Sequence, residues 1–366
     1  MLTQRHAGWR AALPAVLWML AGLLLPGCDT ARYYLQAVGG EIDLLTRRRP
    51  VVDLLADPAT PASLRDRLTL AKAATNFATT NLSLTPTGSF QSYVDLSRPY
   101  AVWSVYATPA LSLEPATWCF PIIGCITYRG YFSATDAHRS GRELANQGMD
   151  TYVAGTPAFS TLGWFDDPLL NTYINWPEPW LTGLIFHEMA HATVYIPGDT
   201  TFNESYAEAV GLIGTERWLQ RSGKEQLLEK HHRHLRRRAQ SLELIHKTRL
   251  LLGAVYTSQR SPESKQAVKV RILAATRAAY RRLVKSWGGE SEFARWFSDD
   301  LNNAQLIALT TYSQWVPAFL TLLAQENGSM EKFHQATRDL GSLPPDIRHA
   351  RLRQLSHPSP PSTPRT

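Results

Sequence analysis

The sequence predicts an α+β protein, in which a small sheet is followed by a largely helical C-terminal block. Residues 93–131 are rich in Val, Trp, Tyr and Thr, and they include an alternating run at 100–106 that is typical of a strand. A second strand-like run covers 150–156. From about residue 179 onward, apolar residues recur at helical spacing over several long segments. Strands followed by a run of helices indicate the α+β class.

The individual elements follow from the same patterns. Residues 29–48 show helical spacing that ends at the Arg-Arg-Arg-Pro sequence of residues 47–50, and residues 62–80 show it again. Further helices are expected near 179–195, 203–221, 224–252, 263–286, 290–301 and 303–325. Neither an internal repeat nor a clear linker divides the chain, so residues 28–342 are interpreted as one domain. Residues 343–366 are rich in Pro and Ser and are expected to form a disordered tail.

The first 27 residues have the pattern of a lipoprotein signal peptide. Arg5 and Arg10 precede an apolar run from Ala11 to Leu25, which is too short to span a membrane comfortably as a mature helix. Gly27 and then Cys28 follow this run, as in the lipobox of bacterial lipoproteins, although Pro26 is unusual there. We therefore expect cleavage before Cys28 and a lipid on its thiol. The alternatives are an uncleaved anchor or an ordinary signal peptide that leaves the thiol free.

Two cysteines remain after Cys28 is assigned to lipid. Cys119 and Cys125 form an even pair in a chain that is expected to enter an oxidising compartment, so a small-loop disulfide is predicted. Two buried thiols are the alternative. A metal site is disfavoured, because the spacing is wider than that of zinc-binding cysteine pairs and no second ligand pair is present.

The positive net charge does not predict a nucleic-acid partner. Lys and Arg exceed Asp and Glu by 38 to 31, but much of the excess lies in the N-terminus, in residues 230–238 and in the tail. The segment 231–238, which contains three histidines and four arginines, is interpreted as a solvated basic face, with anionic lipid headgroups as the alternative contact. No aromatic-interleaved basic repeat accompanies these residues, so nucleic acid is excluded as the expected ligand.

The most informative motif lies in an apolar helical run at residues 184–191. His187 and His191 are four residues apart, so both imidazoles project from one face of the helix. Glu188 lies between them. Burying two imidazoles and a carboxylate in an apolar segment is unfavourable unless a bound metal and its water satisfy them. Zinc fits this donor set, because a hydrolytic zinc site uses nitrogen and carboxylate ligands and keeps one position open for water.

A third protein ligand is expected on the next helix. Glu204 follows a Pro-Gly-Asp turn at 197–199, and two helices that run antiparallel across this turn would bring its carboxylate to the histidines. Glu208, one turn further, is expected to accept the free N–H of a ligating histidine. The alternative exchanges the roles of Glu204 and Glu208. A helix that merely presents these side chains on a partly exposed face is the non-functional interpretation.

A phenol or an imidazole is expected to stabilise the oxyanion of the reaction, but the spacing of the sequence does not select one. The candidates considered are five tyrosines: Tyr152, Tyr173, Tyr195, Tyr206 and Tyr312.

These motifs carry two resemblances. The His-Glu-x-x-His run at 187–191, followed by Asn203-Glu204-x-x-Ala207, resembles the gluzincin metallopeptidases, although the interval between His191 and Glu204 is shorter than in thermolysin-like enzymes. With the sequences at 119–125, 128–132 and 160–165, the chain also resembles, over most of residues 28–340, a family of bacterial lipoproteins labelled putative aminopeptidases.

The resemblances imply a zincin-like core that holds one zinc ion. In gluzincins the glutamate of the Asn-Glu pair is the third ligand, which implies this role for Glu204, and the glutamate between the histidines is the general base, which implies it for Glu188. The expected activity is hydrolysis of peptide bonds by a water that the zinc binds and Glu188 activates, as in an aminopeptidase. An endopeptidase of the cell envelope and a non-catalytic lipoprotein scaffold with a zinc fold are the alternatives.

The expected partners are a peptide substrate and a membrane, reached through the N-terminal lipid. Asp29 directly after the cysteine resembles the inner-membrane retention signal of enteric lipoproteins. This favours the periplasmic face of the inner membrane as the location.

Overall fold

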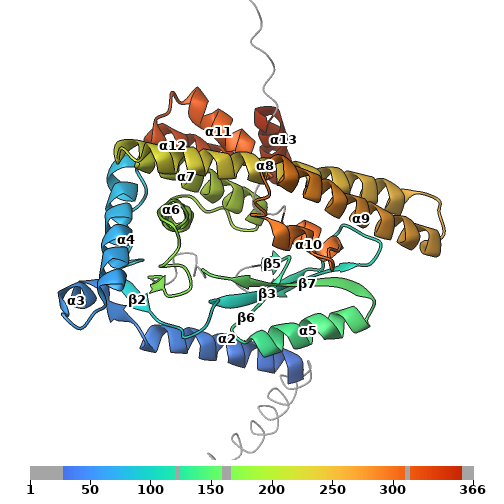
Figure 1. The fold of residues 1–366 in the computed structure, drawn as a ribbon, viewed down its shortest axis with the longest axis horizontal. Coiled ribbons are helices and arrows are strands. Elements are labelled where there is room, and N and C mark those ends of the chain that lie inside the picture. Colours follow the sequence, from blue (N-terminus) through green and yellow to red (C-terminus); the bar gives the residue numbers. More distant parts are fainter. Residues whose placement is uncertain (1–27, 121–123, 159–165, 310–313, 357–366) are drawn as a thin grey trace, which may run out of the picture.

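The computed structural model describes residues 28–120, 124–158, 166–309 and 314–356 (Figure 1). The expected leader at 1–27 lies outside the described residues, as do the motif at 160–165, Tyr312 and residues 357–366. The side chain of Cys28 is likewise not described.

The elements confirm the α+β class. The strands are β1 (Arg49–Pro50), β2 (Ser92–Val94), β3 (Val102–Pro109), β4 (Trp118–Phe120), β5 (Gly124–Ile126), β6 (Arg129–Tyr131), β7 (Met149–Thr156) and β8 (Leu169–Leu170). The helices before the metal-site candidates are α2 (Cys28–Thr46), α3 (Val51–Ala56), α4 (Ala62–Asn81) and α5 (Ala134–Asn146). The later ones are α6 (Glu178–Thr193), α7 (Thr200–Arg221), α8 (Glu225–Thr257), α9 (Pro262–Ser286), the 3₁₀ helix η1 (Ala294–Phe297), α10 (Asn303–Ala308), α11 (Val316–Gln325), α12 (Met330–Gly341) and α13 (Pro345–Ser356).

The antiparallel sheet β6-β3-β7 separates two sets of helices (Figure 1). Its alternating sequence explains this position, because successive side chains of a strand point to opposite faces. Trp103 and Val105 of β3 pack with Tyr131, Val153 and helix α5 on one face. Helix α10 contacts β3 and β7, and Figure 1 shows it with α6 and α7 on the other side of the sheet.

The main hydrophobic core surrounds the helix pair α6–α7. Phe186 of α6 and Phe202 and Tyr206 of α7 are fully buried there. Side chains from α3, α4, α11, α12 and α13 complete this core. The helix pair α8–α9 has a core of its own, which η1 and α10 close with residues such as Phe297 and Leu306. The candidate residues of α6 and α7 are therefore held by the most extensively packed part of the described chain.

Several expectations about secondary structure were wrong. The segment 290–301 forms turns and the short η1 instead of a full helix. The segment 303–325 contains two helices, α10 and α11, and Pro317 lies in the first turn of the second, where its missing N–H is tolerated. Part of the expected disordered tail is helix α13, because Leu352 and Leu355 are buried and the Arg348 guanidinium pairs with Asp199 at 2.9 Å.

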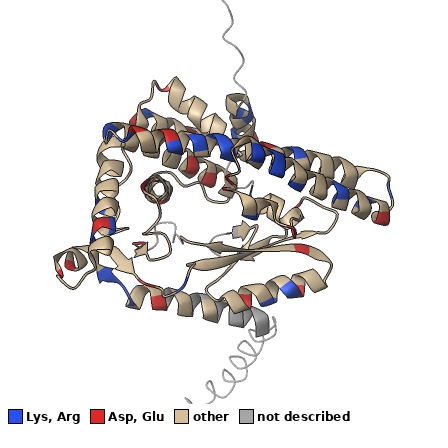
Figure 2. Ribbon diagram, viewed as in Figure 1, with Lys and Arg blue, Asp and Glu red and all other residues tan. Residues whose placement is uncertain are grey.

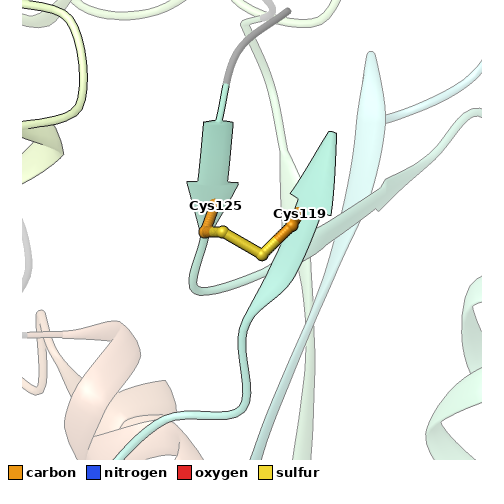
Figure 3. The surroundings of a disulfide bond; sticks show 2 residues. All are labelled: Cys119 and Cys125. Atoms are coloured by element: carbon orange, nitrogen blue, oxygen red, sulfur yellow. A yellow bond between two sulfur atoms is a disulfide. The ribbon is translucent and has the colours of Figure 1, made fainter. Parts of the chain in front are cut away.

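The structure joins Cys119 and Cys125 by a disulfide that links paired positions of β4 and β5 (Figure 3). Residues 121–123, between the two strands, lie outside the described part of the chain. Within the described ranges, no helix has both the length and the hydropathy that crossing a membrane requires.

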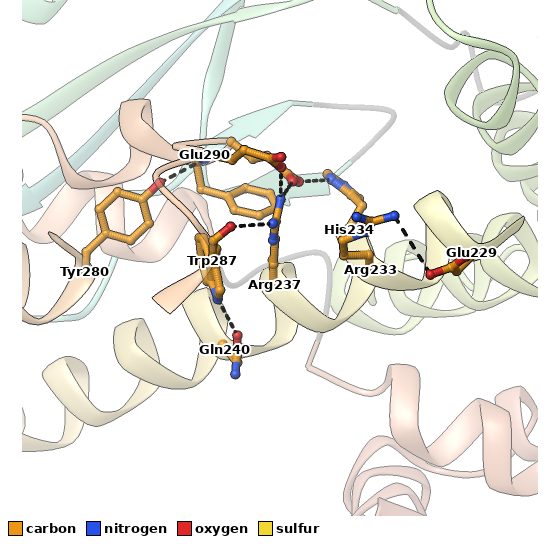
Figure 4. Close-up of polar contacts among 10 residues, drawn as sticks. Glu229, Arg233, His234, Arg237, Gln240, Tyr280, Trp287 and Glu290 are labelled. Atoms are coloured by element: carbon orange, nitrogen blue, oxygen red, sulfur yellow. Dashed lines mark hydrogen bonds and ion pairs between the residues drawn. The ribbon is translucent and has the colours of Figure 1, made fainter. Parts of the chain in front are cut away.

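The basic segment of α8 differs from the solvated face that its composition indicated. The side chain of Arg237 is only 9% exposed and pairs with both Glu290 and Glu292, and it donates to the Trp287 carbonyl at 3.0 Å (Figure 4). His234 pairs with Glu292 at 2.6 Å. Lys and Arg occur along the remaining length of α8 and α9, which Figure 2 shows in blue. Composition alone did not reveal that the acidic partners lie more than 50 residues away.

Candidate metal centre

Helix α6 carries the His-Glu-x-x-His motif through the core. The helix begins at Glu178, and Pro179 occupies its first turn, where a missing N–H has no structural cost. Lys224 and the Trp218 indole hold the Glu178 carboxylate at 2.6 and 2.7 Å. Arg67 donates to the Ile174 carbonyl at 2.8 Å just before the helix. The helix start is therefore fixed by contacts with separate elements of the chain.

The connection from α6 to α7 is fixed by the two polar residues at its far end. The Asp199 side chain caps α7 by accepting from the Phe202 N–H at 3.1 Å. The buried amide of Asn203 brackets one residue of the connection: its oxygen accepts from the Ile196 N–H and its nitrogen donates to the Ile196 carbonyl, both at 2.8 Å. Asn203 thus sets where the first turn of α7 lies, and Glu204 is its neighbour in sequence. This explains in physical terms why an asparagine precedes the glutamate.

Small residues let α6 and α7 approach closely. A Cβ added to Gly211 of α7 would lie 3.0 Å from the Gly183 carbonyl oxygen of α6 and 3.5 Å from the His187 Cβ. A Cβ on Gly183 would lie 2.9 Å from the Thr215 hydroxyl. Larger side chains at these two positions would push the helices apart and separate the side chains that face each other across them.

Three predicted ligands converge between these helices. The Nε2 atoms of His187 and His191 are 3.3 Å apart. The Oε2 atom of Glu204 lies 3.4 Å from the first and 3.7 Å from the second. His191 is 4% exposed, and the side chains of His187 and Glu204 are 13% and 16% exposed, so the cluster is largely buried but still reached by solvent. In the part of the chain that the structure describes, His187, His191 and Glu204 form the group of His, Cys, Asp or Glu residues whose ligand atoms lie close enough together to hold a metal ion.

The charge states of the cluster suit a divalent cation. Burial lowers the pKa of His191 to about 4, against the opposing charge of Glu204, so its ring is neutral at pH 7 and offers a lone pair. Burial alone would also lower the pKa of His187, but its hydrogen bond to Glu204 and the charges of three carboxylates outweigh this and raise the pKa to about 9. Burial opposes ionisation of Glu204 as well, yet the two histidines hold the pKa of its carboxyl below the usual value. A metal ion would replace the proton on His187.

Glu208 lies on the outer side of His187, beyond hydrogen-bond distance of its ring. Its Oε2 atom is 3.8 Å from His187 Nδ1, the ring nitrogen that points away from the cluster. Its other oxygen, Oε1, pairs with Arg238 of α8 at 2.8 Å, and both side chains are 23% exposed. Glu204 rather than Glu208 therefore meets the Nε2 atoms of both histidines. Arg238 was missed by sequence analysis, because the segment around it was interpreted as solvated.

Glu188 faces the same region of the molecule. Its negative charge contributes to raising the pKa values of His187, Tyr128 and Tyr173. The side chain is partly exposed, unlike those of the neighbouring residues Phe186 and Met189. Its Oε2 atom is buried, so the carboxylate between the histidines is partly shielded from solvent.

Two of the tyrosines considered as oxyanion stabilisers are already engaged elsewhere. The Tyr206 hydroxyl bonds to His334 Nδ1 at 2.9 Å in the core. Tyr173 donates to the Pro168 carbonyl at 3.0 Å and is also buried. Tyr195 is 38% exposed, and the charge of Glu204 adds to burial in raising the pKa of its phenol.

Tyr128 is a candidate that sequence analysis did not consider. It precedes β6, and its ring lies 5.6 Å from the ring of Tyr106, which in turn lies 6.4 Å from that of Tyr152, so the three form a row across the sheet. Burial raises the pKa of Tyr128, and the charges of Glu204 and, to a smaller extent, Glu188 raise it more. Its phenol therefore stays protonated at neutral pH. The pairing of β6 with β3, which creates this position, has no signal in the local sequence.

Comparison with known proteins identifies the family. Residues 32–352 match the family described as "Putative aminopeptidase", and this range includes every residue of the cluster. A search of curated proteins and a search of solved structures each found no match to this chain. Because the match covers most of the sequence, the chain belongs to the family described as "Putative aminopeptidase".

Proposed function

We propose that this protein is a zinc-dependent aminopeptidase of the cell envelope. The observation that supports this proposal most strongly is the convergence of the His187 and His191 Nε2 atoms with a Glu204 oxygen, next to Glu188 on the same helix as the histidines. The family description supplies the peptidase class.

The donor set fits zinc in number, type and spacing. Ligands about 2.0–2.2 Å from a tetrahedral zinc ion are roughly 3.3–3.6 Å from one another. The three separations in the cluster are 3.3, 3.4 and 3.7 Å. Two neutral imidazoles and one carboxylate leave a fourth position for water, which distinguishes a catalytic from a structural site.

The side chains around the cluster have complementary roles in this mechanism. A bound zinc ion would lower the pKa of water and polarise the substrate carbonyl. Glu188 accepts a proton from the water whose oxygen attacks the carbonyl carbon, and it returns that proton to the amine nitrogen as the C–N bond breaks. Tyr128 donates a hydrogen bond to the carbonyl oxygen as negative charge develops on it.

A panel of peptides tests the reaction class. An aminopeptidase releases the first residue of free peptides and of aminoacyl anilides, and it does not cleave the same peptides after N-acetylation. Cleavage of N-acetylated, internally quenched peptides at interior bonds would instead assign an endopeptidase. Wild-type protein that binds zinc but cleaves neither set would support the scaffold alternative.

Replacement of the Tyr128 hydroxyl should slow the chemical step. We expect Tyr128→Phe to lower kcat roughly 10²–10³-fold, because one preformed donor to the oxyanion is lost, with little change in zinc content or KM. Tyr106→Phe, which alters the neighbouring ring of the same row, is the matched control and should retain activity. Steady-state kinetics on an aminoacyl anilide measures kcat and KM for both variants. A large effect in Tyr195→Phe and none in Tyr128→Phe would move this role to Tyr195.

Loss of the Glu208 carboxylate should weaken zinc binding without abolishing it. We expect Glu208→Ala to lower zinc affinity about 10–100-fold, because His187 loses the group that orients its ring. Arg238→Ala should have a smaller effect of the same kind, since Glu208 would lose its ion pair, and Arg238→Lys should restore part of the affinity. Competition with a chelator of known affinity measures each variant. Arg236→Ala serves as the control. Equal losses of zinc affinity in Arg236→Ala and Arg238→Ala would contradict the role proposed for Arg238.

Cys28 is proposed to carry a lipid after removal of residues 1–27, with the domain on the periplasmic side of the inner membrane. Cys28→Ser should then yield unprocessed or released protein, because the acyl group supplies membrane affinity. Metabolic labelling with a fatty-acid analogue and fractionation of both forms measure this. Absence of label from the wild type would remove the lipoprotein proposal, whereas recovery in the outer membrane would remove only the proposed location.

A further inference from the structure

Helix α2 is docked on the domain from its first turns. The Tyr33 ring packs against Tyr131 at 5.5 Å, and the Gln36 side chain accepts from the Phe132 N–H at 2.8 Å. Near the other end, Leu44 is 3% exposed in the main core. The helix that begins at the proposed lipid site is therefore a fixed part of the fold, and its orientation fixes that of the domain.

The opposite face of α2 is also apolar but has no described protein partner. Leu35, Ile42 and Leu45 are 74%, 53% and 36% exposed. Their spacing of seven and three residues places them along one side of a helix. Single exposed apolar side chains are common on protein surfaces, but several on one line of a helix indicate a contact surface.

The chain around α2 indicates what covers this face. The apolar leader ends just before Cys28, which lies seven residues before Leu35 and thus on the same line of helix positions. Residues 47–49, directly after the helix, are three consecutive arginines. Arg47 pairs with Asp43 at 2.7 Å and Arg49 with Asp57 at 3.4 Å, and both arginine side chains remain about half exposed, so these are weak surface ion pairs. Basic residues near an apolar helix face favour anionic lipid headgroups, and a single acyl chain gives only marginal membrane binding by itself.

We propose that α2 lies flat in the interface of a phospholipid bilayer with anionic headgroups, with Leu35, Ile42 and Leu45 at the boundary of the acyl chains. This inference rests on the proposed membrane anchoring at Cys28. The face acts as a second membrane signal beside the acyl group. Since Figure 1 shows the sheet β6-β3-β7 between α2 and the helices α6 and α7, the metal centre is held on the side away from the bilayer and takes its substrate from the aqueous phase.

Fluorescent labels at single positions test this orientation. Full-length protein with Leu35→Cys or Ile42→Cys is labelled with an environment-sensitive dye under non-reducing conditions and reconstituted into phosphatidylethanolamine–phosphatidylglycerol vesicles. Val270→Cys on α9, 56% exposed, is the matched control. The parent protein, labelled in the same way, provides the background from the native cysteines. We expect a lipid-borne quencher to act at least about twofold more strongly at 35 and 42 than at 270, and iodide to show the reverse order.

The outcomes separate this inference from the proposals on which it rests. Iodide quenching at 35 and 42 equal to that at 270 would overturn it, and so would protection from both quenchers, which indicates a protein partner or a second copy. Protein that does not associate with membranes at all would also overturn it. Fatty-acid labelling of the same preparations reports the anchor independently: lipid quenching without an acyl label supports the α2 surface and removes only the acyl proposal. Peptide hydrolysis, measured separately, does not depend on either result.

Discussion

Glu188→Gln is expected to keep its zinc and to lose nearly all hydrolysis. The amide has almost the shape of the carboxylate but cannot accept the proton of the attacking water, so kcat should fall roughly 10²–10⁴-fold. The metal should remain, because Glu188 is absent from the group of three converging donor atoms. Metal analysis and kinetics on one preparation measure the two quantities together.

A second glutamine variant controls for the loss of a charge. Glu216 lies on α7, and its side chain is 48% exposed. Glu216→Gln should therefore leave both zinc content and kcat close to those of the wild type. Full activity in Glu188→Gln would contradict its role as the base, and loss of metal from this variant would indicate that it is a ligand.

Removal of a proposed ligand is expected to remove the metal as well as the activity. His187→Ala, His191→Ala and Glu204→Ala should each retain less than about 0.1 zinc ion per chain after dialysis, since two donors do not hold the ion against competing chelators. Circular dichroism checks that the helices persist. The Glu204 variant is the most informative of the three, because the sequence left open whether Glu204 or Glu208 is the ligand.

Comparing the zinc contents of the Glu204 and Glu208 variants decides which of the two glutamates is the ligand. Glu208→Ala should keep a measurable part of its zinc, because its carboxylate is 3.8 Å from the outer nitrogen of His187 and is paired with Arg238. Nearly full zinc in Glu204→Ala together with complete loss in Glu208→Ala would reverse the assignment.

The local parts of the site were predictable from the sequence. His187, Glu188 and His191 lie within one helix, where a spacing of four residues fixes the face on which side chains project. Glu204 was predictable for a related reason, because a short connection between two helices leaves few ways to arrange them. The general division into a sheet and a helical block followed from periodicity, which tertiary contacts rarely override in long segments.

The missed features depend on contacts between distant segments. Arg238 reaches Glu208 from another helix, and Tyr128 lies against Tyr106 beside the pairing of β6 with β3. Helix α13 was assigned to a disordered tail, because the composition of residues 343–366 hides the burial of Leu352 and the pairing of Arg348 with Asp199. In each case the stabilising contact is made with residues that lie far away in the sequence, so the local sequence pattern does not predict it.

The zinc content of the purified protein, measured with its peptidase activity, tests the central claim most directly. We predict close to one zinc ion per chain, loss of hydrolysis of aminoacyl anilides when a chelator removes it, and recovery of hydrolysis when about one equivalent of zinc is returned. The chelated protein should regain less activity with magnesium, which prefers six oxygen ligands. Peptide hydrolysis that persists unchanged in protein shown to contain no metal would contradict the account.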